Sequence, residues 1–216
     1  YQGTEIHILG FFADETDKEL KEGLDRFCQV RKRRNDYMLA RFQEDGFDIT
    51  IEDLTRQNPN TVITRAHFAR VLTEKGYVPS PAKAFEKYLW YGSPYCARKE
   101  IVTPEQVMDL MNRCHVWPCL AHPMQYHLGY EEVETLAARL KEMGLRGLEV
   151  YHSSHVKPQS AKLQVIAKKL GLLPSGGSDF HGDNKPDIEL GTGRGGLRVA
   201  YQLLEDIKED YKKAAR

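Results

Sequence analysis

The chain has 216 residues, 41% of them hydrophobic, and its 31 basic residues balance 31 acidic ones. This length suits one α/β domain, or a domain with a large insertion, and the apolar content is enough for a core. The charge balance excludes a net field that would draw the chain to nucleic acid or to an anionic membrane, so we expect no extended nucleic-acid surface.

Targeting and redox signals are also absent from the sequence. It contains no run of about 18 apolar residues and no signal-peptide pattern, which predicts a soluble, cytoplasmic protein without a membrane span. The four cysteines show no CxxC spacing, and this is typical of a reducing compartment. Because the first residue is Tyr1 rather than Met, we expect the chain to be a fragment or to have lost its beginning.

The first predicted elements are a strand and a helical block. Residues 5–12 alternate as a strand does, with His7 on the same side as Leu9. A lone histidine among apolar neighbours is more often packed in a core than bound to a ligand, so His7 by itself decides nothing. The block that follows, residues 13–100, has no obvious strand, and its predicted helices cover residues 15–45, a short stretch from Thr50, residues 64–76 and residues 80–91.

Two side chains in this block could meet a phosphate. Arg65 lies in the first turn of the helix that Thr64 should cap, where backbone N–H groups and the helix dipole favour anions. A guanidinium there could hold a phosphate through two hydrogen bonds. A surface ion pair for Arg65, with His67 packed beside it, is an equally good interpretation.

After residue 100, helices and short apolar strands alternate. The pattern predicts βαβ units on a parallel sheet or barrel. The predicted helices cover residues 103–112, 130–143, 158–170 and the tail from Leu203, and the predicted strands cover residues 116–121, 147–151 and the run that begins at Leu172.

Metal-binding residue types follow each of these three strands. His122 ends the first, His152 and His155 end the second, and Asp179 and His181 follow the third. In parallel α/β folds the carboxyl ends of the strands carry the site, so we expect these side chains to meet there. A carboxylate and an imidazole together suit a divalent cation.

The spacing at the third strand suggests more detail. We expect Gly176 and Gly177 to break this strand, because glycine allows a tight turn or a close approach. Asp179 and His181 lie two residues apart, so in an extended chain both side chains would point the same way. A Gly-Ser turn with an exposed histidine remains an alternative.

Four of these motifs, EIHILGFF, LAHP, GLEVYHSSH and GSDFH, together resemble the PHP (polymerase and histidinol phosphatase) phosphoesterases. The segments TRAHFARVL and AFEKYLWYGSPY are similar to the helical insertion of one branch, which includes 3′,5′-nucleoside bisphosphate phosphatases and 5′-to-3′ exonucleases acting on short RNA. The resemblance implies an α/β fold, a distorted (β/α)7 barrel. Residues 1–12 and 101–216 would form part of this barrel, and residues 13–100 would form the insertion.

The resemblance also implies a site. It gives metal-binding roles to His7, His122, Asp179 and His181, substrate phosphate-binding roles to Arg65, His67 and His155, and catalytic roles to Asp179, His181 and His155. The cofactors would be divalent ions, manganese, zinc, iron or magnesium, in a trinuclear site. The family's HxH-acid motif, a further His and a bridging Glu do not precede the HILG strand here. We therefore expect the N-terminal part of the barrel to be missing, and this chain alone to bind metal weakly and to be inactive.

The resulting functional hypothesis is a metal-dependent phosphoesterase acting on small phosphorylated substrates, namely nucleotides or short RNA. One alternative is a non-catalytic PHP-like scaffold or binding domain. Another is a histidinol-phosphate phosphatase. The reading frame upstream of Tyr1 would separate the enzyme from the scaffold, and the insertion segments favour nucleotides only through resemblance.

Overall fold

The structure is a computed structural model that describes residues 1–56, 58, 61–90, 92–96, 101–182 and 185–214. Its chain divides into two compact units. Unit 1 comprises Tyr1–Lys21 with Thr103–Arg216, and unit 2 comprises Glu22–Val102. The boundary expected at residue 100 lies outside the described residues. Over the described ranges, no helix has the length and apolar character needed to cross a membrane.

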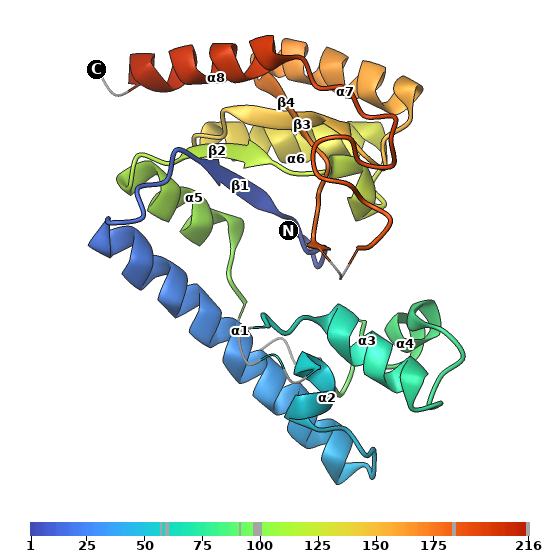
Figure 1. Ribbon diagram of the computed structural model, residues 1–216. Coiled ribbons are helices and arrows are strands. Elements are labelled where there is room, and N and C mark those ends of the chain that lie inside the picture. Colours follow the sequence, from blue (N-terminus) through green and yellow to red (C-terminus); the bar gives the residue numbers. More distant parts are fainter. Residues whose placement is uncertain (57, 59–60, 91, 97–100, 183–184, 215–216) are drawn as a thin grey trace. The chain divides into compact units, whose positions relative to one another are not determined.

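The regular elements follow the order expected from the sequence (Figure 1). The strands are β1 (Ile8–Phe11), β2 (Trp117–Leu120), β3 (Gly147–His152) and β4 (Leu173–Gly177). The helices are α1 (Lys18–Glu44), α2 (Ile51–Thr55), α3 (Arg65–Glu74), α4 (Pro81–Lys87), α5 (Pro104–Arg113), α6 (Tyr130–Glu142), α7 (Lys157–Leu170) and α8 (Tyr201–Ala214), with a 3₁₀ turn, η1, at Pro123–Tyr126. The helix predicted over residues 80–91 is shorter than expected, and Tyr91 lies outside the described residues.

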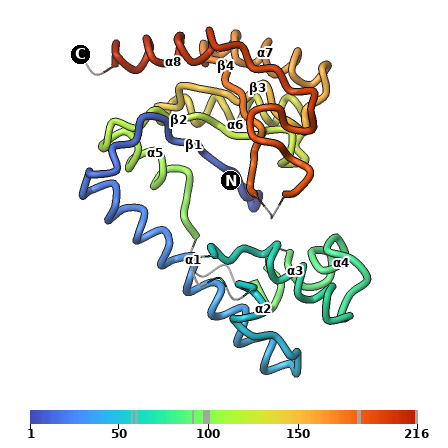
Figure 2. The backbone as a smooth tube through the Cα atoms, in the orientation of Figure 1, coloured from blue at the N-terminus to red at the C-terminus, as the bar shows by residue number. Residues whose placement is uncertain are grey.

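Unit 1 is built on a four-stranded sheet in the order β1-β2-β3-β4. Strands β2, β3 and β4 run parallel, as the alternation of helices and strands predicts. Strand β1 pairs antiparallel with β2, so that Ile8 lies opposite Leu120. Figure 2 follows the chain through β2, α6, β3, α7 and β4. The α/β class is confirmed, and the seven-stranded barrel stays a prediction.

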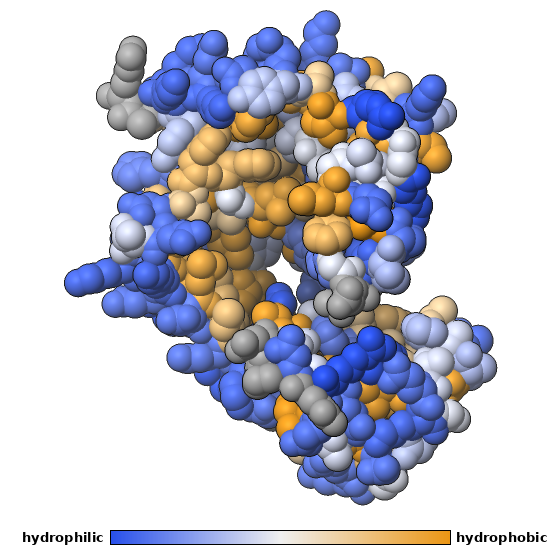
Figure 3. All heavy atoms as spheres, viewed as in Figure 1, coloured by the Kyte–Doolittle hydropathy of each residue, from blue (hydrophilic) through white to orange (hydrophobic). Residues whose placement is uncertain are grey.

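The two faces of this sheet pack against different helices. One face presents Leu120, Leu148 and Val150 to apolar side chains of α6 and α7. On the other face, Trp117 and Cys119 pack with Ile207 of α8. Figure 3 shows apolar side chains gathered over β1 and the strands beside it, where Leu9 is 41% exposed.

Unit 2 has an apolar core of its own. Phe42 of α1 stacks on Tyr95 with ring centroids 4.2 Å apart and on Phe68 of α3 at 5.9 Å. A capping box begins α2, the short helix expected from Thr50: Thr50 Oγ1 accepts from the Asp53 N–H, and Asp53 Oδ2 accepts from the Thr50 N–H. Unit 2 therefore has the buried surface and the helix caps of an independent core.

Candidate metal centre

The pairing of the strands explains how the predicted site residues reach one edge of unit 1. Because β2, β3 and β4 are parallel, their carboxyl ends lie together. Strand β1 runs the other way, so the residue before it falls beside the carboxyl end of β2. The side chains placed at this edge are His7 before β1, His122 after β2, His152 and His155 at and after β3, and Asp179 and His181 after β4.

His7 and His122 form the first pair of candidate metal ligands. The Nδ1 of His7 lies 3.1 Å from the Nε2 of His122, and the rings meet edge to face at 4.8 Å. The Tyr126 hydroxyl, which donates to Ala121 O at 2.6 Å, accepts from the backbone N–H of His7 at 3.0 Å. His7 is exposed, so of the two interpretations open for a lone histidine it does not take the one of a side chain packed in the core. Strand β1 begins only after it and leaves its ring at the rim.

His152 and Asp179 form the second pair. The Nε2 of His152 lies 3.5 Å from Asp179 Oδ2, and the ring of His152 is 5.6 Å from that of His122. The backbone N–H of Ser154 donates to His152 Nδ1, which leaves the proton of the neutral ring on Nε2, facing the carboxylate. The structure thus brings the His122 and Asp179 regions together through His152.

Two details expected near Asp179 are wrong. Gly176 and Gly177 do not break the strand, because both belong to β4. The absence of a side chain at Gly176 instead lets β4 lie close to β3, because a Cβ on Gly176 would lie 2.8 Å from the Tyr151 Cβ. Asp179 is not extended, since its φ is +59°. Its turn nevertheless brings His181 near, with Nδ1 3.4 Å from Asp179 Oδ1.

The ammonium of Lys185, a residue that the sequence did not single out, forms an ion pair with Asp179 Oδ2. Burial alone would raise the pKa of Asp179, but the hydrogen bond and charge of Lys185, and then the charge of His181, outweigh it and hold the pKa below its ordinary value. Asp179 is therefore a carboxylate at neutral pH. Lys185 contacts one oxygen of the Asp179 carboxylate, and the same carboxylate could also bind a divalent cation.

His122 and His152 are buried and His155 is half-buried, and all three are held in their neutral form. Burial, and then the charge of His7, lower the pKa of His122 to about 4. Burial also lowers the pKa of His155, and burial followed by the charge of His155 lowers that of His152. Neutral imidazoles keep a lone pair, which is the form that binds metals.

The unpartnered nitrogens test whether these residues fit a cation. The buried His122 Nδ1 and His155 Nε2 have no hydrogen-bond partner among the described residues. Buried polar atoms normally have one, so these nitrogens fit a ligand or ion. The described part of the chain contains no group of three His, Cys, Asp or Glu side chains that could already hold a metal ion. The candidate metal ligands occur instead as pairs, and each pair fits as part of a larger metal site.

Glu149 is a member of this edge that the sequence analysis missed. It is 4% exposed, and its Oε2 accepts from the backbone N–H of His122 at 2.6 Å. Burial, with a smaller effect of the charge of Asp179, raises its pKa to about 7. The only signal in the sequence is one acidic residue between apolar neighbours in the strand GLEVYH.

Arg65 and His67 belong to unit 2, where both make local contacts. Arg65 Nη1 donates to Leu89 O at 3.1 Å, and its guanidinium lies 5.6 Å from the centre of the Phe85 ring. His67 Nδ1 lies 2.9 Å from Thr64 Oγ1 and accepts from the Thr64 N–H. Some donors of Arg65 and one nitrogen of His67 thus stabilise α3 and its surroundings.

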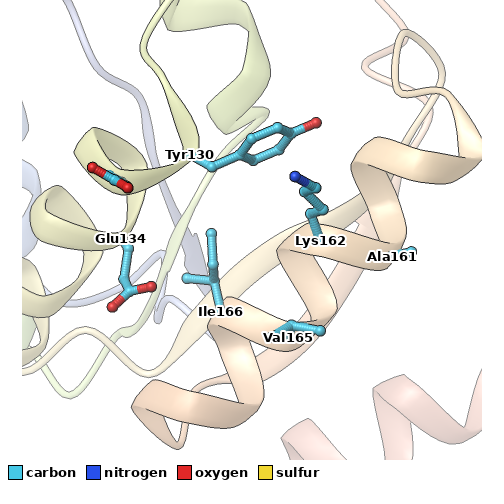
Figure 4. Close-up of a pocket in the computed structure, with 7 residues that line it drawn as sticks. Tyr130, Glu134, Ala161, Lys162, Val165 and Ile166 are labelled. Carbon is cyan, nitrogen blue, oxygen red and sulfur yellow. The ribbon is translucent and has the colours of Figure 1, made fainter.

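A surface pocket of about 420 Å³ lies between α6 and α7 (Figure 4). Lys162 Nζ lies 4.7 Å from the centre of the Tyr130 ring at this pocket. Its lining residues are Tyr130, Glu131, Glu134, Ala161, Lys162, Val165 and Ile166. None of the predicted site residues is among them, so this pocket is separate from the histidine edge.

Comparison with known proteins gives several matches, although no family model matches the chain. The 5′-3′ exoribonuclease Rnm of Escherichia coli strain K12 is 31% identical over 208 residues, which cover 95% of this chain and 71% of that protein. The 3′,5′-nucleoside bisphosphate phosphatase of Chromobacterium violaceum is 29% identical over 188 residues, covering 86% and 66%. The chain therefore spans about two thirds of the length of these relatives.

A solved structure supports the same relationship. A protein of Bifidobacterium adolescentis, described as a metal-dependent phosphoesterase, superposes with a TM-score of 0.71 at 26% identity, over 96% of this chain and 72% of that one. Together, the sequence relatives and this structure show that the chain belongs to the PHP-type family of phosphoesterases.

Proposed function

We propose that the protein hydrolyses phosphate esters of nucleotides or short oligonucleotides with the help of divalent metal ions. The observation that carries the proposal is the pair of buried, unpartnered imidazole nitrogens on His122 and His155, at the same edge as the Asp179 carboxylate. The names of the relatives, an exoribonuclease and a nucleoside bisphosphate phosphatase, support this substrate class.

His7, His122, Asp179 and His181 are the residues proposed to hold the cations. The two His7 and His122 nitrogens that face each other supply one half-site, and Asp179 with His181 supplies another. Divalent cations there would neutralise phosphoryl oxygens and lower the pKa of water from about 15.7 to about 7. That is more than a positioned base alone provides, since general base catalysis contributes about 10²–10⁴-fold.

His155 is proposed to serve the substrate. Its Nδ1 lies 3.1 Å from Val150 O, a carbonyl that can only accept, so the ring proton sits on Nδ1 and the lone pair on Nε2. Nε2 can take up a proton, hydrogen-bond a phosphoryl oxygen in that form, and pass the proton to the leaving oxygen. Arg65 and His67 are proposed as phosphate contacts from unit 2.

The test uses the full-length protein and Asp179→Asn. Losing the carboxylate should reduce turnover of adenosine 3′,5′-bisphosphate by at least about 100-fold, because even residues behind the ligands of a metal cost about 10–100-fold. Asp187→Asn is the matched control, since Asp187 is exposed and pairs with Arg194. Unchanged turnover by the Asp179 variant would refute the assignment.

Substrate choice needs a separate comparison. After chelation and re-addition of manganese, the protein should cleave nucleoside bisphosphate or short 5′-phosphorylated RNA faster than histidinol phosphate. Preference for histidinol phosphate would replace the nucleotide assignment. No turnover of any of these by the full-length protein, with any divalent ion, would favour a binding domain.

A further inference from the structure

Strand β3 carries a buried carboxylate in a place where an apolar side chain would be expected. Glu149 is 4% exposed, and its neighbours Leu148 and Val150 are fully buried on the opposite face of the sheet. Removing a carboxylate from water costs several kcal/mol even after the protein relaxes. A side chain that costs so much needs a compensating contact.

That contact is the backbone of His122. Glu149 Oε2 accepts the His122 N–H at 2.6 Å, which is shorter than an ordinary N–H···O hydrogen bond. His122 has φ +26° and ψ +56°, a left-handed conformation that costs a residue with a side chain about 1–2 kcal/mol. Such a conformation persists only where surrounding groups hold it.

The same contact decides where the His122 ring points. With the backbone turned in this way, Nε2 lies 3.1 Å from His7 Nδ1, and Nδ1 is buried without a partner among the described residues. Strand β4 leaves room for the carboxylate, because a Cβ on Gly177 would lie 3.2 Å from Glu149 Oε1. The end of β2, the middle of β3 and the end of β4 thus form one arrangement around Glu149.

We propose that Glu149 is the positioning residue of this site: its carboxylate holds the backbone of His122 in the left-handed conformation that presents the imidazole toward His7 and a bound cation. The part of the inference that concerns the bound cation rests on the proposed function. Its geometric part concerns the His122 backbone and can be tested without metal.

The experiment compares Glu149→Leu, Glu149→Gln and Ser175→Ala in the full-length protein. Leucine fills the space and removes the acceptor, and it also removes the cost of burying a carboxyl group. Glutamine keeps an oxygen that can accept the His122 N–H. Ser175 is the matched control, because it is buried and lies opposite Glu149 in the register of β3 and β4.

Two measurements are made on each protein. The first is the amide proton shift and exchange rate of His122, by NMR with chelator present. The second is the affinity for Mn²⁺ alone. Leucine should move the amide proton upfield, speed its exchange and weaken Mn²⁺ binding by about 10–100-fold, whereas glutamine and the serine control should stay near the parent protein.

The outcomes separate the two proposals. An unchanged His122 amide in the leucine variant would overturn the inference. So would equal losses of Mn²⁺ affinity in the leucine and glutamine variants, because that pattern marks a direct ligand. If the parent protein binds no Mn²⁺ while the amide still responds as expected, the proposed function fails and the positioning contact stands. Should the leucine variant not fold, loss of both readouts in the glutamine variant overturns the inference, and their retention supports it.

Discussion

Replacing Glu149 by glutamine in the metal-free protein should change how stability depends on pH. Two buried groups at the same edge titrate in opposite directions. Burial raises the pKa of Glu149 from 4.5 to about 7. Burial, and then the charge of His7, lower the pKa of His122 from 6.5 to about 4. Each group therefore binds protons differently in the folded and unfolded chains, and this links folding to pH.

The two contributions have opposite signs. Between about pH 4.5 and 7 the folded protein keeps a proton on Glu149 that the unfolded chain has lost, so this contribution stabilises the fold as pH falls. At about 1.36 kcal/mol per pKa unit, it reaches about 3 kcal/mol. Between about pH 6.5 and 4 the unfolded chain protonates His122 and the folded protein does not, so this contribution is lost as pH falls. Discounted for solvent screening, it is about 1–2 kcal/mol.

The glutamine variant keeps only the second contribution. In urea unfolding with chelator, its free energy of unfolding should drop more between about pH 7 and about pH 5 than that of the parent protein, by about 2–3 kcal/mol. Ser175→Ala should follow the parent curve, because no charge is removed. Parallel pH curves for the glutamine variant and the parent would refute the reasoning, since Glu149 would then be ionised in the folded state.

Three further comparisons test individual contacts. His122→Gly should be about 1–2 kcal/mol more stable in urea unfolding than His122→Ala, because only alanine pays for the left-handed backbone; equal stabilities would show that the turn is relaxed. Tyr126→Phe removes the hydroxyl that accepts the His7 N–H and should cost about 1–3 kcal/mol, and a melting temperature equal to the parent's would contradict it. Gly176→Ala should cost about 1–3 kcal/mol through overpacking against β3, while Gly196→Ala, with open space around it, should be close to neutral in the same measurement.

Much of the fold is predictable because local residues mark the ends of its elements. Thr103 caps α5 by accepting from the Gln106 N–H, and Gly171 ends α7 with φ +62°. Both signals are read from a few neighbouring residues. The end of α4 was less predictable, since the helical pattern continues beyond Lys87 while the helix does not.

The meeting of the candidate site residues at one edge is predictable for a different reason. Parallel strands place their carboxyl ends together, so the sequence pattern alone predicts that His122, His152 and Asp179 meet. The role of Glu149 could not, because it depends on the backbone N–H of His122, which lies 27 residues away just after the neighbouring strand β2. The left-handed turns at His122 and Asp179 were equally hidden, since neither residue is a glycine.

The two separate cores have a practical consequence for spectroscopy. The protein has two tryptophans, and each unit contains one: Trp117 is 1% exposed on β2, and Trp90 is 51% exposed in unit 2. Domains with independent cores need not unfold in one step, so each unit has a free energy of unfolding of its own. A Trp90→Phe protein would leave Trp117 as the only indole fluorophore. Its emission would then report unfolding of the sheet that carries the histidine edge, and unit 2 would contribute no tryptophan fluorescence.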